Sequence, residues 1–262
     1  MELGRGFMKV VGGSSVPAVK RGDIPVIDPS DGQKFTTIAR GGSEDVDDGV
    51  LAARRAYGNV WRNTPAVERG RFLTRLSARI LERHAELAEL ECRDTGKPIH
   101  QARIDIAACA RYFEFYGGAA DKLHGETIPY AEGFTVFALR EPYGVTGHII
   151  PWNYPAQILG RTVGASLAAG NACVVKPAED ACLSVVRIAE LALDSGLPVG
   201  VFNVITGLGI EAGAALAAHT GIDHLSFTGI SFGRRLGRTG CRRQSHTGGA
   251  RAWRQIAPDC FR

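Results

Sequence analysis

The chain has 262 residues, of which 45% are hydrophobic and 22% charged, and its mean hydropathy is −0.04. This length and composition are typical of a folded chain with one large domain or two small ones, and they exclude intrinsic disorder. The formal net charge is only +4, and the basic residues are scattered until the last stretch. The body of the chain therefore carries no pattern typical of nucleic-acid binding.

The six cysteines form no C-x-x-C pair, which indicates free thiols in a reducing compartment. We interpret Cys92, Cys109, Cys173 and Cys182 as small buried hydrophobic residues. The start shows no signal-peptide pattern, and no apolar run approaches the roughly 20 residues that a membrane helix needs. The histidines are scattered, so we expect no metal site. These features predict a cytoplasmic protein without membrane or nucleic-acid partners.

The first predicted elements are strands followed by helices. Short β-rich runs with Gly and Pro between residues 4 and 42 predict paired edge strands, with a turn at Asp28 to Gly32. From Ser43 the pattern becomes helical. Residues 66–98 place apolar side chains on one helical face that ends at Gly96 and Pro98, and a further helix covers roughly 99–123. We expect these helices to be scaffold, with their charges on solvated faces.

Residues 127–143 alternate well enough for two strands around Glu132 and Gly133. Such a hairpin could protrude and pair with another subunit. An ordinary internal hairpin would have the same pattern, and both alternatives remain open.

An alternation of strands and helices follows. Apolar strands are predicted at 144–151, 172–177, 201–206 and 224–229, separated by helical patterns at 157–170, 182–196 and 210–219. This order predicts right-handed crossovers and a buried parallel sheet. The expected fold is therefore α/β: an open parallel Rossmann-like sheet with flanking helices, an N-terminal β-rich segment and a β-hairpin that protrudes.

Polar groups follow three of these strands. They are Asn153 within "PWNYP", the pair Lys176 and Glu179 within "KPAE", and the glycines of "TGLGIEAG". Because ligands bind beyond the carboxyl ends of parallel strands, we expect these groups on one edge of the sheet. Asn153 itself could be turn punctuation or a hydrogen-bond donor aimed at a substrate.

Lys176 and Glu179 can both face a ribose, with the ammonium donating and the carboxylate accepting, although an exposed ion pair would have the same spacing. Glu179 would repel a 2′-phosphate, so the pair favours NAD over NADP. Gly207, Gly209 and Gly213 permit close approach of the backbone to a dinucleotide. Their spacing differs from the usual G-x-G-x-x-G, and a plain turn would also explain them.

Four motifs, "IIPWNYP", "AAGNACVVKPAE", "GVFNVITG" and "DHLSFTG", resemble the NAD(P)-dependent aldehyde dehydrogenase superfamily in order and spacing. The segments "DPSDG" and "ECRDTGKP" also fit, and the resemblance covers about residues 20–229. Within the superfamily the chain looks most similar to the betaine aldehyde and ω-aminoaldehyde dehydrogenases.

The resemblance implies a mechanism in which a cysteine thiolate attacks an aldehyde, hydride passes to the nicotinamide, and a glutamate-activated water hydrolyses the thioester. It implies that Asn153 is the catalytic amide that stabilises the oxyanion, and that the 127–143 hairpin is a homo-oligomerisation element. The implied cofactor-binding residues are Ile150, Pro151 and Trp152 in the cleft, Lys176 and Glu179 at the ribose, and Gly209 and Gly229 at the adenine and pyrophosphate. Gly213, Phe227 and Thr228 are further implied cofactor-binding residues.

The chain departs from the family pattern after Gly229. In the family pattern, Ser and a Gly after "FTG" open the next helix, but here the spacing from Gly229 to Gly233 is one residue short. Residues 230–262 are basic and aperiodic. The family's "LELGGKSPxIVF" segment, which carries the general-base Glu, and its later nucleophilic Cys are not written here. Cys241 and Cys260 lack the family's flanking residues and are poor substitutes.

A frameshift explains this tail. Read one nucleotide later, Trp253 and Arg254 must yield Gly, and the codons through Arg262 permit Gly-Lys-Ser-Pro-Gln-Ile-Val-Phe. Thr247 to Gly249 permit Leu-Glu in the same frame. We therefore divide the chain into an NAD-binding domain at 1–229 and an aberrant tail at 230–262, with the catalytic domain absent.

The sequence thus predicts an aldehyde dehydrogenase that has lost its thiol and general base and has little or no turnover. Three classes remain open: an enzyme that uses an unusual Cys, a non-catalytic dinucleotide-binding or subunit-interaction fragment, and a degraded gene product that does not unfold cooperatively.

Overall fold

The computed structural model describes residues 9–17 and 22–229, so the 230–262 tail and the predicted domain boundary at its start lie outside the described residues. Its centre is a six-stranded sheet with the strand order β10-β7-β8-β9-β1-β2. The strands are β1 (Lys9–Val11), β2 (Ser14–Val16), β7 (Val145–Ile150), β8 (Ala172–Pro177), β9 (Phe202–Val204) and β10 (His224–Phe227).

The sheet is parallel where the sequence predicts it to be. β7 pairs in parallel with β8 and β10, and β8 with β9. The registers place Ile150 opposite Pro177 and Phe227 opposite Ile149, so the carboxyl ends of these strands meet at one edge. The prediction of an α/β fold is confirmed. The sheet is mixed rather than purely parallel, because β1 pairs antiparallel with β9 and carries β2 at its outer side.

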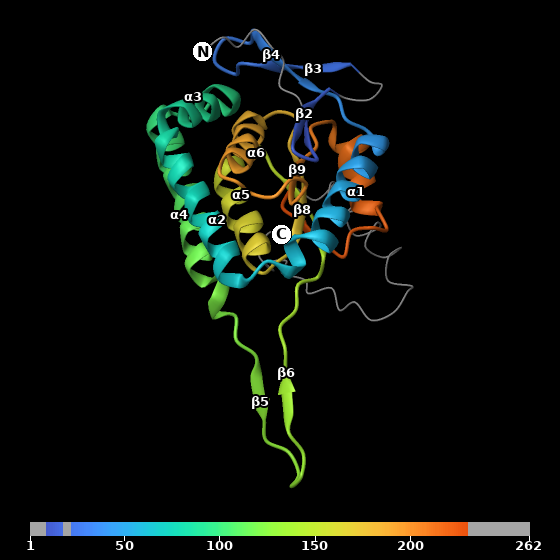
Figure 1. The fold of residues 1–262 in the computed structure, drawn as a ribbon. Helices are drawn as coiled ribbons and strands as arrows, with labels where there is room; N and C mark the ends of the chain where they lie inside the picture. The colour runs from blue at the N-terminus through green and yellow to red at the C-terminus, as the bar shows by residue number, and fades with distance from the viewer. Residues whose placement is uncertain (1–8, 18–21, 230–262) are drawn as a thin grey trace, which may run out of the picture.

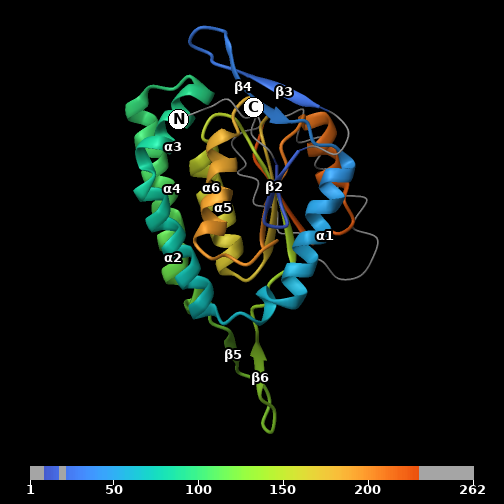
Figure 2. The same cartoon turned by 45° about the horizontal axis from the view of Figure 1, so that its top comes forward.

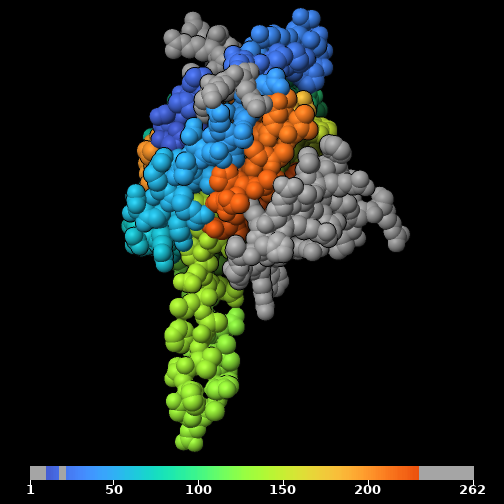
Figure 3. Space-filling model, turned by 90° about the vertical axis from the view of Figure 1, so that its right-hand side faces the viewer, coloured from blue at the N-terminus to red at the C-terminus, as the bar shows by residue number. Residues whose placement is uncertain are grey.

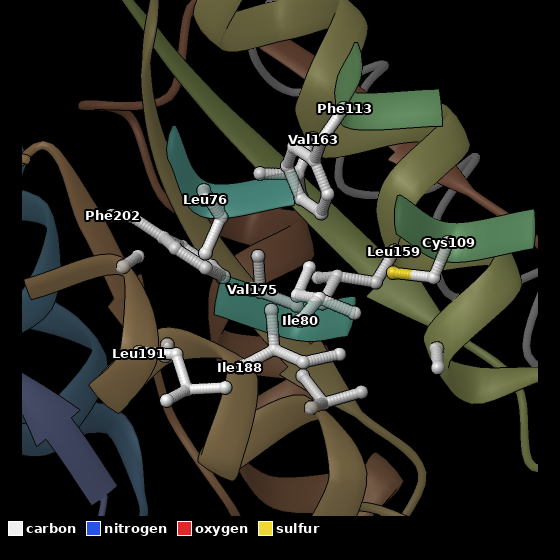
Figure 4. Close-up of a cluster of buried hydrophobic side chains, with 14 of the residues drawn as sticks. Leu76, Ile80, Cys109, Phe113, Leu159, Val163, Val175, Ile188, Leu191 and Phe202 are labelled. Atoms are coloured by element: carbon white, nitrogen blue, oxygen red, sulfur yellow. The ribbon is translucent and has the colours of Figure 1, made fainter. Parts of the chain in front are cut away.

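Helices cover both faces of the sheet (Figures 1 and 2). On one face lie α5 (Pro155–Ala168) and α6 (Leu183–Asp194), and on the other α1 (Ser43–Asn59) and α7 (Ala214–Ala218). The alternation of side chains along a strand explains the two cores. Val175 faces the core under α5 and α6, whereas its neighbour Val174 faces the core under α1. Figure 4 shows the larger core, with Val175, Leu159 and Ile188 drawn together.

A further layer packs outside α5 and α6. The predicted helical face over 66–98 divides at Arg83 into α2 (Ala66–Glu82) and α3 (His84–Thr95), and α4 (Ile99–Ala119) follows as predicted. Gly96 ends α3 with a φ of 73°, a conformation that glycine adopts without strain. The short 3₁₀ segments Trp61–Asn63 and Ala120–Lys122 complete this part of the chain.

The expectation that the charged side chains of these helices are solvated is wrong for a cluster of three acidic residues. Glu91 and Asp105 are fully buried, and Asp94 is 2% exposed. Such burial is tolerated only when the charges find partners. These partners include the ammonium of Lys97, which lies just after α3.

Two small hairpins stand apart from the central sheet. The first pairs β3 (Asp23–Ile27) with β4 (Lys34–Ala39), and its turn closes at Gly32 as predicted. The second pairs β5 (Glu126–Ile128) with β6 (Val136–Ala138). Figures 1 and 3 show that this second hairpin projects far from the body of the molecule, so it is not an internal hairpin.

No helix among the described residues is long and apolar enough to cross a membrane.

Candidate functional site

The turn from β8 into α6 carries the predicted ion pair. Lys176 is the next-to-last residue of β8 and its side chain is only 2% exposed, and Glu179 lies three residues later with 29% of its side chain exposed. Lys176 Nζ donates to Glu179 Oε2 at 2.6 Å. The pair is therefore largely buried, not the exposed ion pair that the sequence left open.

The environment keeps Glu179 ionised. Burial pushes the pKa of its carboxyl upwards, but the charge of Lys176 and the hydrogen bonds from Lys176 and Gly209 outweigh burial. The net result is a pKa below the ordinary value of 4.5. An ammonium has three donors and each carboxylate oxygen accepts more than one hydrogen bond. The pair therefore keeps capacity for a hydroxyl ligand, and a ligand reaching it from solvent meets Glu179 first.

The glycine-rich segment after β9 lies against this pair. Gly209 N–H donates to Glu179 Oε1 at 3.1 Å. Residues Gly209–Gly213 form one π-helical turn that leads into α7, a local geometry that is frequent at functional sites. A Cβ at position 209 would lie 3.8 Å from Glu179 Oε1, an ordinary van der Waals contact. Glycine here therefore places a backbone N–H, and no side chain, against the partly exposed carboxylate.

The other two glycines are explained by packing. Gly207 has a φ of 147°, and a Cβ there would lie 2.5 Å from the carbonyl oxygen of Gly41. Close contact between two backbones accounts for this glycine. Gly213 packs against the stem of Lys176, with its ideal Cβ position 3.8 Å from Cδ. Of the three, only Gly209 directly touches the carboxylate that we expect to bind a ligand.

The segment after β7 presents the second group. Ile150 is buried, Pro151 is half-buried, and Trp152 is 58% exposed. Asn153 is exposed in the bend that precedes α5. Its backbone carbonyl accepts a hydrogen bond of 3.1 Å from Lys97 Nζ. A backbone held in place beneath an exposed amide is suited to presenting that amide to a substrate.

The end of β10 adds the last predicted residues. Phe227 is partly buried and pairs with Ile149, and Thr228 N–H donates to the Ile149 carbonyl at 3.1 Å. Gly229 is exposed directly afterwards. Lys176, Glu179, Gly209 and Gly213 thus form one contact group, while Phe227 to Gly229 lie beside the end of β7 on the same edge.

The cysteines in this region are not nucleophiles. Cys109, Cys173 and Cys182 are fully buried, and burial raises the pKa of each thiol, for Cys173 to about 11. A thiol must ionise to attack a carbonyl. Cys92 is half-buried, and its Sγ donates to the Lys97 carbonyl at 3.0 Å. The interpretation of these four residues as structural thiols is confirmed for the three that are fully buried.

Sequence reasoning missed Glu91, Asp94, Lys97 and Asp105. Lys97 forms buried ion pairs with Glu91 and Asp105 and reaches the Asn153 backbone, whereas Asp94 accepts a hydrogen bond from Leu183 N–H at the start of α6. The only available signal was the segment "ECRDTGKP", whose acidic residues repeat three apart before a Gly-Lys.

Comparison with known proteins identifies the family of this chain. The profile of the aldehyde dehydrogenase family matches residues 16–251. The chain belongs to the aldehyde dehydrogenase family. A putative aldehyde dehydrogenase from Burkholderia cenocepacia superimposes with a TM-score of 0.90 at 60% identity, covering 91% of this chain and 50% of that one. A Bacillus cereus aldehyde dehydrogenase in complex with NAD+ superimposes equally well, with a TM-score of 0.90 at 34% identity, covering 92% and 50%.

The hydroxyisobutyraldehyde dehydrogenase of Mycolicibacterium austroafricanum is 46% identical over 231 residues, which is 88% of this chain and 46% of the relative. The chain therefore spans about half the length of the aldehyde dehydrogenases it matches, and corresponds to their N-terminal half. The expected similarity to betaine aldehyde and ω-aminoaldehyde dehydrogenases is wrong, because the relatives are named for other aldehydes.

Proposed function

We propose that this chain is the NAD-binding half of an enzyme that oxidises an aldehyde to a carboxylate. The contact group of Lys176, Glu179 and Gly209 carries the proposal, because it puts a buried cation, an ionised acid and a side-chain-free backbone at the carboxyl edge of a parallel sheet. When bound, NAD supplies the hydride acceptor. The name of the Bacillus cereus relative, an NAD+ complex, supports the same assignment.

Each site residue has a role in this proposal. Glu179, fixed by Lys176 and Gly209, accepts hydrogen bonds from the adenosine ribose. Trp152 offers an exposed ring, and with Ile150 and Pro151 it lines the cofactor cleft. Phe227, Thr228 and Gly229 border the remainder of the dinucleotide, and Gly213 supports the site by packing against the stem of Lys176. Asn153 donates its amide to the oxyanion that develops on the aldehyde carbon.

A titration of the purified 262-residue chain with NAD tests the proposal. Calorimetry should detect one NAD per chain, with NADP bound at least about tenfold more weakly because Glu179 repels a 2′-phosphate. Equal binding of both would contradict the ribose role of Glu179. A chain that unfolds cooperatively but binds neither would refute the proposed function.

We further propose that the chain binds the cofactor without turnover. In this reading residues 1–229 are the NAD-binding domain, and residues 230–262 are an out-of-frame tail in place of the family's glutamate and cysteine. The encoding nucleotides test the tail directly. Codons that cannot spell "GGKSPQIVF" in the next frame would refute the frameshift.

The projecting hairpin favours self-association as a second function. Tyr130, Phe134, Phe137 and Leu139 are each more than 60% exposed on it. Such a concentration of apolar side chains marks an interaction surface. We propose that the hairpin pairs with a second copy of the chain.

Replacing Phe134 and Phe137 together with serine should convert an oligomer into a monomer in light scattering, while leaving NAD affinity unchanged. Leu51, which is 54% exposed on α1, offers a matched control as Leu51→Ser. The assignment would be contradicted if the unchanged chain is a monomer. It would also be contradicted if the chain with both Phe134 and Phe137 replaced by serine is still an oligomer.

A further inference from the structure

Two helices that begin at the candidate site do not cap themselves. α5 follows Tyr154 and α6 follows Cys182, and neither of these residues makes a side-chain hydrogen bond to its helix. The first N–H groups of a helix have no partner within it and need acceptors from elsewhere. Here the acceptors come from α3. Ala156 N–H donates to Glu91 Oε2 at 3.3 Å, and Leu183 N–H donates to Asp94 Oδ2 at 2.8 Å.

The same end of α3 also holds the Asn153 bend. Lys97 Nζ donates to Glu91 Oε1 at 3.0 Å, to Asp105 Oδ2 at 2.7 Å and to the Asn153 carbonyl at 3.1 Å. All three donors of its ammonium thus have partners. The Lys97 side chain is 11% exposed, and those of Glu91 and Asp105 are 0% and 1% exposed.

Glu91 links the two loops to each other. Its Oε2 accepts from Ser184 Oγ at 2.7 Å as well as from Ala156 N–H, so one carboxylate contacts the first turns of both α5 and α6. The bend before α5 carries Asn153, and the turn before α6 carries Glu179. These are the two polar groups that the proposed function requires in a fixed relation.

A buried ion network is poor evidence for stability, because well-packed apolar residues in its place are often as stable. Its effect on geometry is specific, because its hydrogen bonds are directional and fix the first turns of α5 and α6. We propose that Glu91, Asp94, Lys97 and Asp105, here called the α3 clamp, are positioning residues that hold the Asn153 bend and the Glu179 turn in register for the cofactor. The functional part of this inference rests on the proposed NAD binding.

Amide hydrogen exchange on the full 262-residue chain tests the clamp without relying on NAD. Lys97→Met removes the donor to the Asn153 carbonyl, and should speed exchange in residues 152–158 about tenfold. Asp94→Ala removes the acceptor of Leu183 N–H, and should do the same in residues 180–186. Asp94→Asn keeps an oxygen acceptor at that position and should restore the slow exchange. In both Lys97→Met and Asp94→Ala, NAD affinity should fall about tenfold.

Ile80→Val is the matched control. Ile80 is fully buried on α2 in the same core, and loss of its methylene weakens packing without touching the clamp. Ile80→Val should not selectively speed amide exchange in residues 152–158 or 180–186. Exchange in 152–158 and 180–186 that changes no more in the clamp variants than in Ile80→Val would overturn the proposal.

A milder variant covers the case in which Lys97→Met fails to fold. Ser184→Ala removes only one hydrogen bond to Glu91 and should raise exchange at the first turns of α5 and α6 by several-fold. If exchange at these two first turns is unchanged in Ser184→Ala, the clamp proposal is likewise overturned. If the local exchange effects occur but the unchanged chain does not bind NAD, the clamp stands as a structural device and the proposed function fails.

Discussion

Replacing Lys176 with methionine should weaken NAD binding by at least about 30-fold and lower the free energy of unfolding. Methionine preserves an apolar stem against Gly213 but supplies no cation. Glu179 would then keep the Gly209 N–H and its own backbone N–H as donors, but no cation. Removing one partner of a buried hydrogen-bonded charge pair costs about 2–5 kcal/mol. Calorimetric titration and urea unfolding measure the two effects separately.

A matched control is Lys122→Met, which removes a lysine that is 63% exposed and forms a surface ion pair with its neighbour Asp121. Pairs at the surface contribute little. This control should bind NAD like the unchanged chain. If Lys176→Met also binds NAD within about twofold of the unchanged chain, the ribose assignment is wrong.

The same substitution should change the pH dependence of stability. The folded-state pKa of Glu179 lies below its ordinary value of 4.5, so this group contributes stability that is present above pH 4.5 and is lost as the pH falls through the lowered pKa. Without Lys176 the main cause of the lowering disappears, and burial should raise the pKa instead. In Lys176→Met the Glu179 contribution should therefore change sign, so that stability falls as the pH rises above 4.5 instead of falling as the pH drops below it.

Restoring the reading frame should have the largest effect on activity. The 262-residue chain should not reduce NAD in the presence of aldehydes. The thiols of Cys109, Cys173 and Cys182 are buried and protonated, that of Cys92 is hydrogen-bonded to the Lys97 carbonyl, and Cys241 and Cys260 lack the family's flanking residues. A chain whose corrected frame continues with the family's glutamate and cysteine should oxidise an aldehyde. Enzymes accelerate reactions by at least about a millionfold, so the difference is large. Formation of reduced nicotinamide with a panel of aldehydes measures it.

In the restored chain, Asn153→Ala should lower kcat by about 100- to 1000-fold with little change in NAD affinity, because an oxyanion donor acts in the transition state. Asn63→Ala removes an exposed amide from the 3₁₀ segment after α1 and serves as the control. Turnover by the 262-residue chain, or full activity of Asn153→Ala, would contradict the assigned roles.

Sequence periodicity was sufficient for the order of strands and helices, because each β–α step is local. It was also sufficient for Lys176 and Glu179, which are three residues apart in one turn. It was insufficient for the α3 clamp, since Glu91 and Ser184 lie 93 positions apart and no local pattern links them. The pairing of β1 with β9 could not be predicted for the same reason, because Val10 and its partner Val204 lie far apart in the sequence.

The central claim is that the carboxyl edge of the parallel strands holds the dinucleotide. Amide hydrogen exchange of the 262-residue chain with and without saturating NAD tests it most directly. Bound NAD should slow exchange in residues 178–182 and 207–213 and in the bend at 152–154, and should leave the hairpin at 126–138 unchanged. NAD binding that leaves residues 207–213 unprotected would contradict it.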